Sequence, residues 1–324
     1  MNSHAPYDVA IVGGGPAGLT AAVWLARHLR SVVVIDSGDP RNWETRGVHG
    51  YLGLPDITPA ELRGRGREEA RALDAELLDG TVERIARIGD DLFRLTVIDI
   101  GNPGRPGQRP PELQGQRTVE LDSRRVLLAI GIKDIWPDVP GLDRCYGDTV
   151  HHCPSCDGYE VRDCKTVVIA NGRRAVGMAL DLATWTRDLV ICTHGEAPDF
   201  EGALGAKLRA LDIPVVSERI VRVVSRESRV VGLELEGGRV LDCQRIFFSI
   251  GKYPSDDLGV QLHCRRDEEG FIITDERYHT SVPNVFAAGD IIAGPYLALR
   301  AAADGAVAGM AIHRSLLPPE LTLD

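Results

Sequence analysis

The 324-residue sequence contains no apolar run that approaches the ~18 residues a helix needs to cross a bilayer. Its first residues, 1–8, are polar, and the apolar stretch 9–12 is too short for the core of a signal peptide. We therefore expect neither a membrane protein nor a secreted one. The sequence also lacks a long basic run and carries a net charge of −10. No nucleic-acid partner is expected, because a phosphate backbone binds clustered lysine and arginine.

Cysteine is sparse, at seven residues, and only one pair has close spacing. An odd number of cysteines without a signal peptide favours a reducing compartment, so we expect a cytoplasmic protein. Apolar residues make up 44% of the chain and charged residues 26%, which is ordinary for a globular protein. The length suggests about two domains, and a chain of this size does not need disulfides to stabilise its core.

The N-terminal residues predict a strand–helix–strand unit. Tyr7–Val12 is typical of a strand, a glycine cluster follows it, and apolar residues over Leu19–Leu29 have helical spacing. Ser31–Ile35 is expected to be the second strand, which ends at Asp36. A βαβ unit of this kind implies a parallel sheet.

The glycine cluster has the spacing of a dinucleotide-binding turn, with Gly13, Gly15 and Gly18 in the pattern GxGxxG. Glycines permit a tight turn, and the helix N-terminus then offers free N–H groups to a pyrophosphate. An acid at the end of the second strand is placed to accept hydrogen bonds from a ribose. The alternative is a glycine turn beside a solvated acid. The expected nucleotide-binding residues are Gly13, Gly15, Pro16, Ala17, Gly18 and Asp36.

Further elements are expected along the rest of the chain. The pattern predicts a helix over Pro59–Leu78, an antiparallel ribbon over Val82–Ile100 and a mobile hairpin loop over the Gly/Pro-rich stretch Gly101–Arg117. Val126–Gly131 and Ile246–Gly251 resemble each other, and each is interpreted as a crossover between domains.

A second βαβ unit is expected after Lys165. Thr166–Ile169 and Leu189–Cys192 are expected to be strands, and Arg174–Thr186 is expected to be the helix between them. A final helix is expected over Leu297–Leu316. The two βαβ units form a weak internal repeat.

The close cysteine pair is Cys153-Pro-Ser-Cys156, followed by Asp157. Two thiols at this spacing can close a small disulfide ring, and the carboxylate beside them can shuttle a proton. We interpret them as a redox pair. The alternatives are a zinc site, which lacks a second CxxC, and two inert thiols. His151 and His152 precede the pair and are expected in a loop, where one could help activate a thiol. The other cysteines are expected in the core, namely Cys145, Cys164, Cys192, Cys243 and Cys264.

A third motif, Phe286-Ala-Ala-Gly289-Asp290, precedes the final helix. An acid that follows a buried strand and a glycine can bind a ribityl or pyrophosphate oxygen, directly or through water. The alternative interpretation is a plain turn at a strand end.

Together these motifs resemble the low-molecular-weight thioredoxin reductase family. Their order matches over nearly the whole chain: GGGPAG, then CPSCDG, then a second βαβ unit, then VFAAGD. The resemblance implies an α/β fold of two Rossmann-like, three-layer domains, one inserted in the other. The expected domains are 1–134 and 250–324, which bind FAD, and 135–249, which carries the cysteine pair. It also implies a homodimer.

The resemblance also implies roles for residues. Cys156 would face the flavin, Cys153 would exchange with the substrate sulfur, and Asp157 would be the acid/base. Gly289 and Asp290 would bind FAD, and Leu297 and Ala298 would lie beside the flavin at the start of the last helix. No metal is expected.

Departures from the family pattern lie at the NADPH site. The family's second glycine loop, of the type GGGxxA, reads here Ala170-Asn171-Gly172-Arg173-Arg174-Ala175, so its first glycine is lost. The basic cluster that grips the 2′-phosphate is replaced by Thr193-His-Gly-Glu196, where the acid would repel a phosphate. Leu297 replaces a glutamine beside the flavin, and the loop 38–43 lacks the family's glycine-glycine-glutamine turn. NADPH is therefore a doubtful cofactor.

The sequence thus predicts an FAD-dependent disulfide oxidoreductase of the thioredoxin reductase type that does not use NADPH. It resembles branches that take electrons from ferredoxin, that hold a second flavin in the emptied pocket, or that oxidise dithiols with oxygen. The expected partner is a thioredoxin-like protein or a small disulfide or dithiol. The alternatives are an ordinary NAD(P)H-dependent thioredoxin reductase, a dithiol oxidase of the same fold and a non-enzymatic redox or nucleotide sensor.

Overall fold

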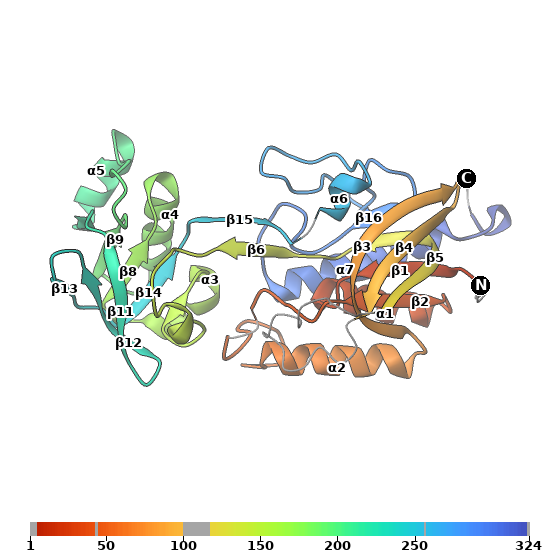
Figure 1. Ribbon diagram of the computed structural model, residues 1–324, viewed down its shortest axis with the longest axis horizontal. Helices are drawn as coiled ribbons and strands as arrows, with labels where there is room; N and C mark the ends of the chain where they lie inside the picture. Colours follow the sequence, from red (N-terminus) through yellow and green to blue (C-terminus); the bar gives the residue numbers. More distant parts are fainter. Residues whose placement is uncertain (1–4, 43–44, 100–116, 256, 323–324) are drawn as a thin grey trace. The chain divides into compact units, whose positions relative to one another are not determined.

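The computed structural model describes residues 5–42, 45–99, 117–255 and 257–322 (Figure 1). Of the loop expected over Gly101–Arg117, residues 101–116 lie outside these ranges, and Arg117 is the first residue of strand β5 (Arg117–Leu128). The chain divides by its contacts into two compact units. The first comprises Met1–Trp43, Tyr51–Lys133 and Tyr253–Asp324, and the second comprises Glu44–Gly50 and Asp134–Lys252. Two paired strands, β6 (Ile132–Ile135) and β15 (Gly251–Pro254), carry the chain from the first unit to the second and back.

The first unit is built on one six-stranded sheet. Its strands are β1 (Tyr7–Val12), β2 (Val32–Asp36), β3 (Glu76–Gly89), β4 (Leu92–Asp99), β5 (Arg117–Leu128) and β16 (Val285–Ala287). Strand β1 pairs in parallel with β2 and β5, and β16 pairs in parallel with β5. Strands β3 and β4 are antiparallel to each other, as are β4 and β5. Strand β5 therefore belongs both to the parallel sheet and to the antiparallel ribbon.

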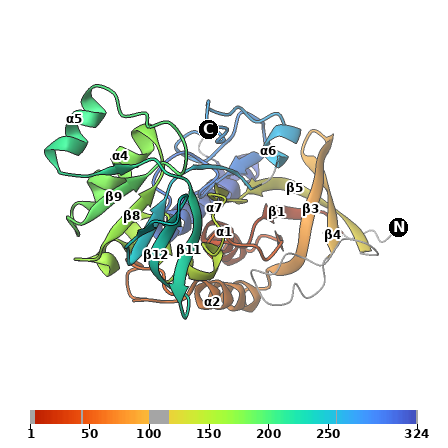
Figure 2. The ribbon, with the colours of Figure 1, turned by 60° about the vertical axis from the view of Figure 1, so that its left-hand side comes forward.

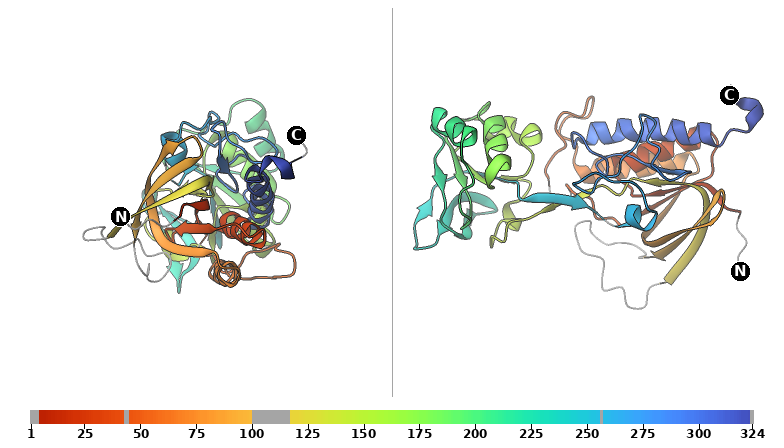
Figure 3. Two further views of the ribbon diagram at one scale, coloured as in Figure 1. Left: turned by 90° about the vertical axis from the view of Figure 1, so that its right-hand side faces the viewer. Right: turned by 90° about the horizontal axis from the view of Figure 1, so that it is seen from above.

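Helices α1 (Pro16–Arg27) and α7 (Ala298–Ser315) lie side by side over one face of this parallel sheet (Figure 3). Helix α2 (Pro59–Ala72) packs against α1, the short α6 (Leu258–Gln261) packs against β3, and a 3₁₀ helix, η3 (Pro319–Leu321), follows α7. One core fills the space between α1, α7 and the sheet, and a second core fills the space between the sheet and the ribbon. The unit therefore has three layers.

The second unit has a smaller parallel sheet of five strands in the order β10-β9-β8-β14-β7. Its strands are β7 (Val150–His151), β8 (Thr166–Ile169), β9 (Leu189–Cys192), β10 (Val215–Val216) and β14 (Arg245–Phe248). An antiparallel ribbon covers one face, with β11 (Ile220–Arg226), β12 (Arg229–Leu235) and β13 (Val240–Leu241). The other face is covered by α4 (Gly172–Leu182) and α5 (Ala203–Ala210) (Figure 2). The shorter helices are η1 (Asp143–Cys145), α3 (Pro154–Asp157) and η2 (Tyr159–Val161).

The predicted α/β class, with two Rossmann-type units and one inserted in the other, is confirmed. The structure corrects two helix boundaries. The helix expected over Arg174–Thr186 spans Gly172–Leu182. The helix expected to run to Leu78 ends at Ala72, and β3 begins at Glu76. Asp74 has a left-handed backbone, with φ of 65°, which ends the helix. Leu77 and Leu78 then pair with β2, because their apolar side chains complete the sheet.

The contact between α1 and α7 depends on glycine. A β-carbon at Gly305 of α7 would lie 2.0 Å from the Ala17 carbonyl oxygen of α1. A β-carbon at Gly177, in the exposed face of α4, would meet no atom within 4 Å. The two glycines therefore have opposite environments, although each lies inside a helix.

We predict that Gly305→Ala lowers the free energy of unfolding by about 1–3 kcal/mol, because the added methyl group forces α7 away from α1. The control, Gly177→Ala, should raise it by roughly 0.5–1 kcal/mol, because alanine is the better helix former. Denaturant unfolding of both variants checks the pair. A Gly305→Ala protein as stable as the wild type would show that the two helices are not in this contact.

Candidate active site

The cysteine pair lies at the start of a short helix in the second unit. Cys153 is the N-cap of α3, and its Sγ accepts a hydrogen bond from the Cys156 N–H at 3.2 Å. The two cysteines form a disulfide. Pro154 lies in the first turn of the helix, where an N–H group would have no helical partner. The local sequence therefore brings both sulfur atoms into one tight turn, as reversible exchange requires.

Asp157 is the last residue of α3 and is buried. Its Oδ1 lies 4.0 Å from His49 Nε2 and 3.6 Å from His151 Nδ1. Burial raises the pKa of Asp157 to about 6, an effect that His49 opposes and Glu160 adds to. This carboxyl can therefore both hold and release a proton near neutral pH, next to the disulfide.

His49 comes to this carboxyl from a distant part of the chain. The segment Glu44–Gly50 belongs to the second unit, although the residues on both sides of it belong to the first. The other ring nitrogen, Nδ1, lies 3.9 Å from Glu160 Oε1. Sequence reasoning does not select His49, because a single histidine in a loop-rich stretch has no motif and no informative spacing.

His151 is buried in strand β7, which corrects its expected place in a loop. Its ring centroid lies 5.2 Å from that of Phe247, and its Nε2 has no hydrogen-bond partner among the described residues. Burial, reinforced by Arg245, lowers the pKa of His151 to about 3. The ring is therefore neutral near neutral pH and is a poor proton acceptor.

His152 belongs to an aromatic cluster that directly precedes the cysteine pair. Its Nδ1 lies 2.7 Å from Tyr146 Oη, and its Nε2 lies 3.8 Å from Asp134 Oδ2. Trp136 packs on Tyr146 with ring centroids 4.5 Å apart and leaves 41% of its surface exposed. His152 is thus held between an acid and a phenol beside a partly exposed indole.

The five other cysteines form no disulfide, and most of them are buried. Cys164 is half-buried and the rest are buried: Cys145, Cys192, Cys243 and Cys264. Burial raises the pKa of Cys243 to about 12, so this thiol is not a nucleophile near neutral pH. The prediction that these cysteines lie in the core is confirmed for the four buried ones.

The glycine turn of the first unit fits a pyrophosphate. Gly15 is the N-cap of α1, which has no side-chain cap and no acid in its first turn. A β-carbon at Gly18 would lie 1.9 Å from the Gly13 carbonyl oxygen, and one at Gly13 would lie 2.2 Å from the Ala129 carbonyl oxygen. A β-carbon at Gly15 would meet open space. The first N–H groups of α1 therefore face an open position where an anion can lie.

The C-terminal motif packs against this turn. Gly289 has a left-handed backbone, and a β-carbon there would lie 2.8 Å from Ala17 Cβ, one residue after Pro16. Two motifs that are far apart in the sequence thus form one site in the first unit. Leu297 is the N-cap of α7 and Ala298 is its first residue, and this helix start also has no side-chain cap.

Two acids of the first unit are held by arginines. Asp36, at the end of β2, accepts hydrogen bonds from Arg63 Nε at 3.0 Å and from Arg67 Nη1 at 3.3 Å. Asp290 Oδ2 lies 3.6 Å from Arg41 Nη1. Burial raises the pKa of Asp290, and Arg41 opposes that rise. The sequence patterns select both acids but not the arginines, which lie outside the motifs.

The start of the second βαβ helix is closed by the protein itself. Asn171 is the N-cap of α4, and its Oδ1 accepts the N–H groups of Gly172 and Asp199 at 2.9 and 3.0 Å. Its Nδ2 donates to Glu196 Oε2 at 3.0 Å and to the Ala197 carbonyl at 2.9 Å. The Asn171 side chain therefore lies at this helix start, fixed by the loop 196–199, whereas the N-cap of the corresponding helix in the first unit is Gly15, which has no side chain.

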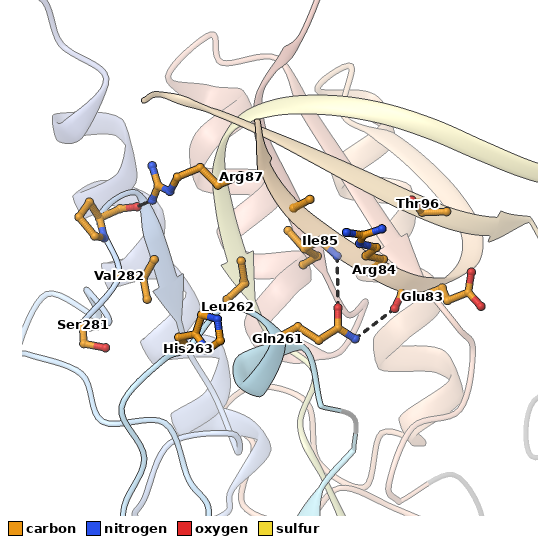
Figure 4. Close-up of a pocket in the computed structure, with 12 residues that line it drawn as sticks. Glu83, Arg84, Ile85, Arg87, Thr96, Gln261, Leu262, His263, Ser281 and Val282 are labelled. Carbon is orange, nitrogen blue, oxygen red and sulfur yellow. Dashed lines mark hydrogen bonds between the residues drawn. The ribbon is translucent and has the colours of Figure 1, made fainter. Parts of the chain in front are cut away.

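An open groove of about 970 Å³ lies elsewhere on the first unit, beside β3 (Figure 4). Gln261 crosses it, donating to the Glu83 carbonyl at 3.2 Å and accepting the Ile85 N–H at 3.4 Å. None of the residues expected to bind FAD lines it.

Within the described part of the chain, no helix is long and apolar enough to span a membrane. The same residues contain no cluster of three His, Cys, Asp or Glu side chains suited to a metal ion.

Comparison with known proteins agrees with this arrangement. The model of the pyridine nucleotide-disulphide oxidoreductase family matches residues 7–305. The structure is similar to that of HlmI, with a TM-score of 0.85 and 34% identity, covering 98% of this chain and 94% of that one. It is also similar to the thioredoxin reductase from Streptococcus pyogenes, with a TM-score of 0.85 and 26% identity, covering 97% and 99%.

The curated relatives are longer proteins. The F subunit of alkyl hydroperoxide reductase from Staphylococcus epidermidis is 26% identical over 298 residues, which cover 90% of this chain and 55% of that protein. The chain thus spans about half the length of the curated relatives it matches.

The burial of Asp157 predicts a pH-dependent stability. Its pKa rises from 3.8 to about 6 on folding, so the folded state binds this proton more tightly than the unfolded chain does. Stability should therefore fall as the pH rises through the window from about 4 to 6. Above it, the ionised carboxyl lowers the free energy of unfolding by about 2–3 kcal/mol.

Asp157→Asn should accordingly be more stable than the wild type above pH 6 and equal to it near pH 4. Denaturant unfolding of both proteins across this range measures the difference, in which the contribution of other titrating groups largely cancels. Glu160→Gln is the control, because Glu160 is more exposed and its loss should change the curve little. A pH-independent difference would contradict the burial of the charge.

Proposed function

The chain belongs to the pyridine nucleotide-disulphide oxidoreductase family, and on that basis we propose an FAD-dependent disulfide oxidoreductase that does not use NADPH. FAD, when bound, would supply electrons to the Cys153–Cys156 pair or take them from it, and the pair exchanges with an external disulfide or dithiol. One observation carries the proposal: the helix start after β1 is open to a pyrophosphate, and the equivalent helix start after β8 is closed by Asn171.

The first unit has the groups that would hold FAD. The N–H groups at the start of α1 would bind the pyrophosphate, and glycine is required at Gly13 and Gly18. Asp36 would bind the adenosine ribose and Asp290 the ribityl chain. When bound, the flavin would supply electron exchange between the cysteine pair and a non-thiol donor or acceptor, which the side chains alone cannot perform.

The second unit opposes a dinucleotide. A pyrophosphate at α4 would have to displace the Asn171 side chain and break its four hydrogen bonds. It would also approach the carboxylates of Glu196 and Asp199, and a Gly172 β-carbon position lies 3.1 Å from Asp199 Oδ2. Like charges at such distances repel strongly in a partly buried site. The same argument opposes the pyrophosphate of a second flavin in this pocket.

The residues of the cysteine turn perform the exchange. In the reductive direction, the Cys153 thiolate attacks a substrate disulfide, and the first substrate sulfur leaves as a thiolate that takes a proton. The Cys156 thiolate then attacks Cys153 Sγ, the second substrate sulfur leaves and is protonated, and the Cys153–Cys156 disulfide forms. Asp157 holds or releases a proton for these steps. The same steps in reverse order oxidise a dithiol and release two protons.

The partners follow from this chemistry. The external substrate is a thioredoxin-like protein or a small disulfide or dithiol, and the other electron partner is ferredoxin, another non-nicotinamide donor or, in the oxidase direction, oxygen. We further propose a cytoplasmic homodimer. The aromatic cluster of Trp136, Tyr146 and His152 beside Cys153 supports a substrate with an apolar or aromatic part.

An anaerobic titration of the purified protein, followed by its flavin absorbance, tests the donor. We expect bleaching by dithiothreitol but not by stoichiometric NADPH or NADH, and one flavin per chain on release and counting. Rapid bleaching by NADPH would establish an ordinary NADPH-dependent reductase. It would also refute the proposal that Asn171 at the start of α4 opposes dinucleotide binding. Peroxide formed from a dithiol in air would assign the oxidase direction.

The two cysteines predict different variant behaviour. Cys156→Ser should abolish electron transfer between the flavin and the pair, because it removes the sulfur proposed to react with the flavin. Cys153→Ser should remove reaction with the external substrate while leaving the Cys156 thiol in place. Stopped-flow reduction by a dithiol and turnover assays distinguish the two. Unaltered turnover in Cys156→Ser would disprove the mechanism.

A further inference from the structure

His49 lies between two carboxylates that differ in their access to solvent. Its Nε2 is 4.0 Å from Asp157 Oδ1, and its Nδ1 is 3.9 Å from Glu160 Oε1. The exposed fraction of the side chains rises from 13% for Asp157 to 26% for His49 and 39% for Glu160. The three side chains thus form a row from the buried acid beside the disulfide toward the surface.

The proposed exchange needs a path for protons between the buried Asp157 and solvent. Each reduction of an external disulfide delivers two protons to leaving thiolates, and each oxidation of a dithiol releases two. Asp157 is buried, so a proton that it takes or gives must be replaced from solvent before the next cycle. His151, the other ring that faces Asp157, cannot relay this proton, because it is buried and has a pKa of about 3.

We propose that His49 relays protons between Asp157 and solvent by way of Glu160. The inference rests on the proposed function and assigns to it a residue that acts through Asp157 rather than on the reacting sulfurs. Both nitrogen–oxygen separations suit transfer through one bridging water. An imidazole is the side chain suited to the task, because it can take a proton on one nitrogen and give it from the other.

The protons in these steps balance without another reactant. In the oxidative direction, a thiol proton passes to the Asp157 carboxylate, then to His49 Nε2, and His49 Nδ1 gives its own proton toward Glu160 and water. In the reductive direction, each step reverses. The charged and titratable groups that act on Asp157 are His49, Glu160 and His151. Those that act on His151 are Arg245, His152 and His49, and the Asp148 backbone also forms a hydrogen bond with this ring.

His49→Gln tests the relay, because glutamine keeps polarity and approximate size but does not carry a proton. Turnover should fall by about 10²-fold, the lower end of what general acid–base groups contribute. The pH profile should shift upward, because the positive charge that favours the Asp157 carboxylate is lost. Imidazole added to His49→Ala should restore turnover. His279→Gln is the matched control, because it removes a ring from another carboxylate, Asp275, in the first unit.

A second measurement separates the relay from the proposed function. In dithiol-reduced protein, alkylation of Cys153 by iodoacetamide, located by peptide mass, needs no electron donor. His49→Gln should move its pH profile up by about one unit, because loss of a charge within ~4–6 Å raises the pKa of Asp157, the group proposed to take the thiol proton. An unchanged profile with normal flavin reduction would overturn the relay alone. A shifted profile in a protein whose flavin never exchanges electrons with the pair would overturn the proposed function alone. Loss of turnover with a wild-type profile and no rescue by imidazole would make His49 merely structural and overturn the relay.

Discussion

The first N–H groups of an α-helix have no partner inside the helix, and the two units of this chain satisfy that requirement in opposite ways. In the first unit, glycine at Gly15 adds no side chain at the start of α1, so the N–H groups remain available to a ligand. In the second, Asn171 supplies an oxygen to Gly172 and to Asp199 and fixes the neighbouring acidic loop with its amide. The same βαβ architecture therefore gives one helix start without a side-chain cap and one that is capped by Asn171. The proposed choice of cofactor follows from this difference of one side chain.

A second constraint, the burial of a charge, organises the cysteine turn. Asp157 is the last residue of the short helix that also carries Cys156 and is capped by Cys153. Burial in this position destabilises the ionised carboxyl, which lowers stability above its pKa but keeps a proton on the group at higher pH, as the proposed role in thiol chemistry requires. A solvated acid would be more stable and less useful, because its proton would be lost well below neutral pH. Function and stability thus oppose each other at one carboxyl.

The sequence predicts those parts of the structure whose signal is local. The strands Tyr7–Val12, Thr166–Ile169 and Leu189–Cys192 have the expected bounds, because apolar runs between turn residues determine them. The boundary of α2 is wrong, because pairing of Leu77 and Leu78 with β2 overrides the helical pattern. The loss of a glycine at the second turn is visible in the sequence. That an asparagine side chain would itself take the ligand's place is not, because it depends on Glu196 and Asp199 folding back onto the turn.

His49 shows most directly where sequence reasoning ends. The motif that contains Asp157 is recognisable in the sequence. His49, which lies beside Asp157, comes from the distant segment Glu44–Gly50, and no sequence pattern links the two segments. His49 lies near Asp157 because the segment Glu44–Gly50 is part of the second unit, although the residues before and after it belong to the first. A proton path needs neighbours in space with graded exposure, and a row such as Asp157, His49 and Glu160 can be assembled from any part of a chain. Motifs therefore identify the atoms that react, whereas only the fold identifies the groups that supply them with protons.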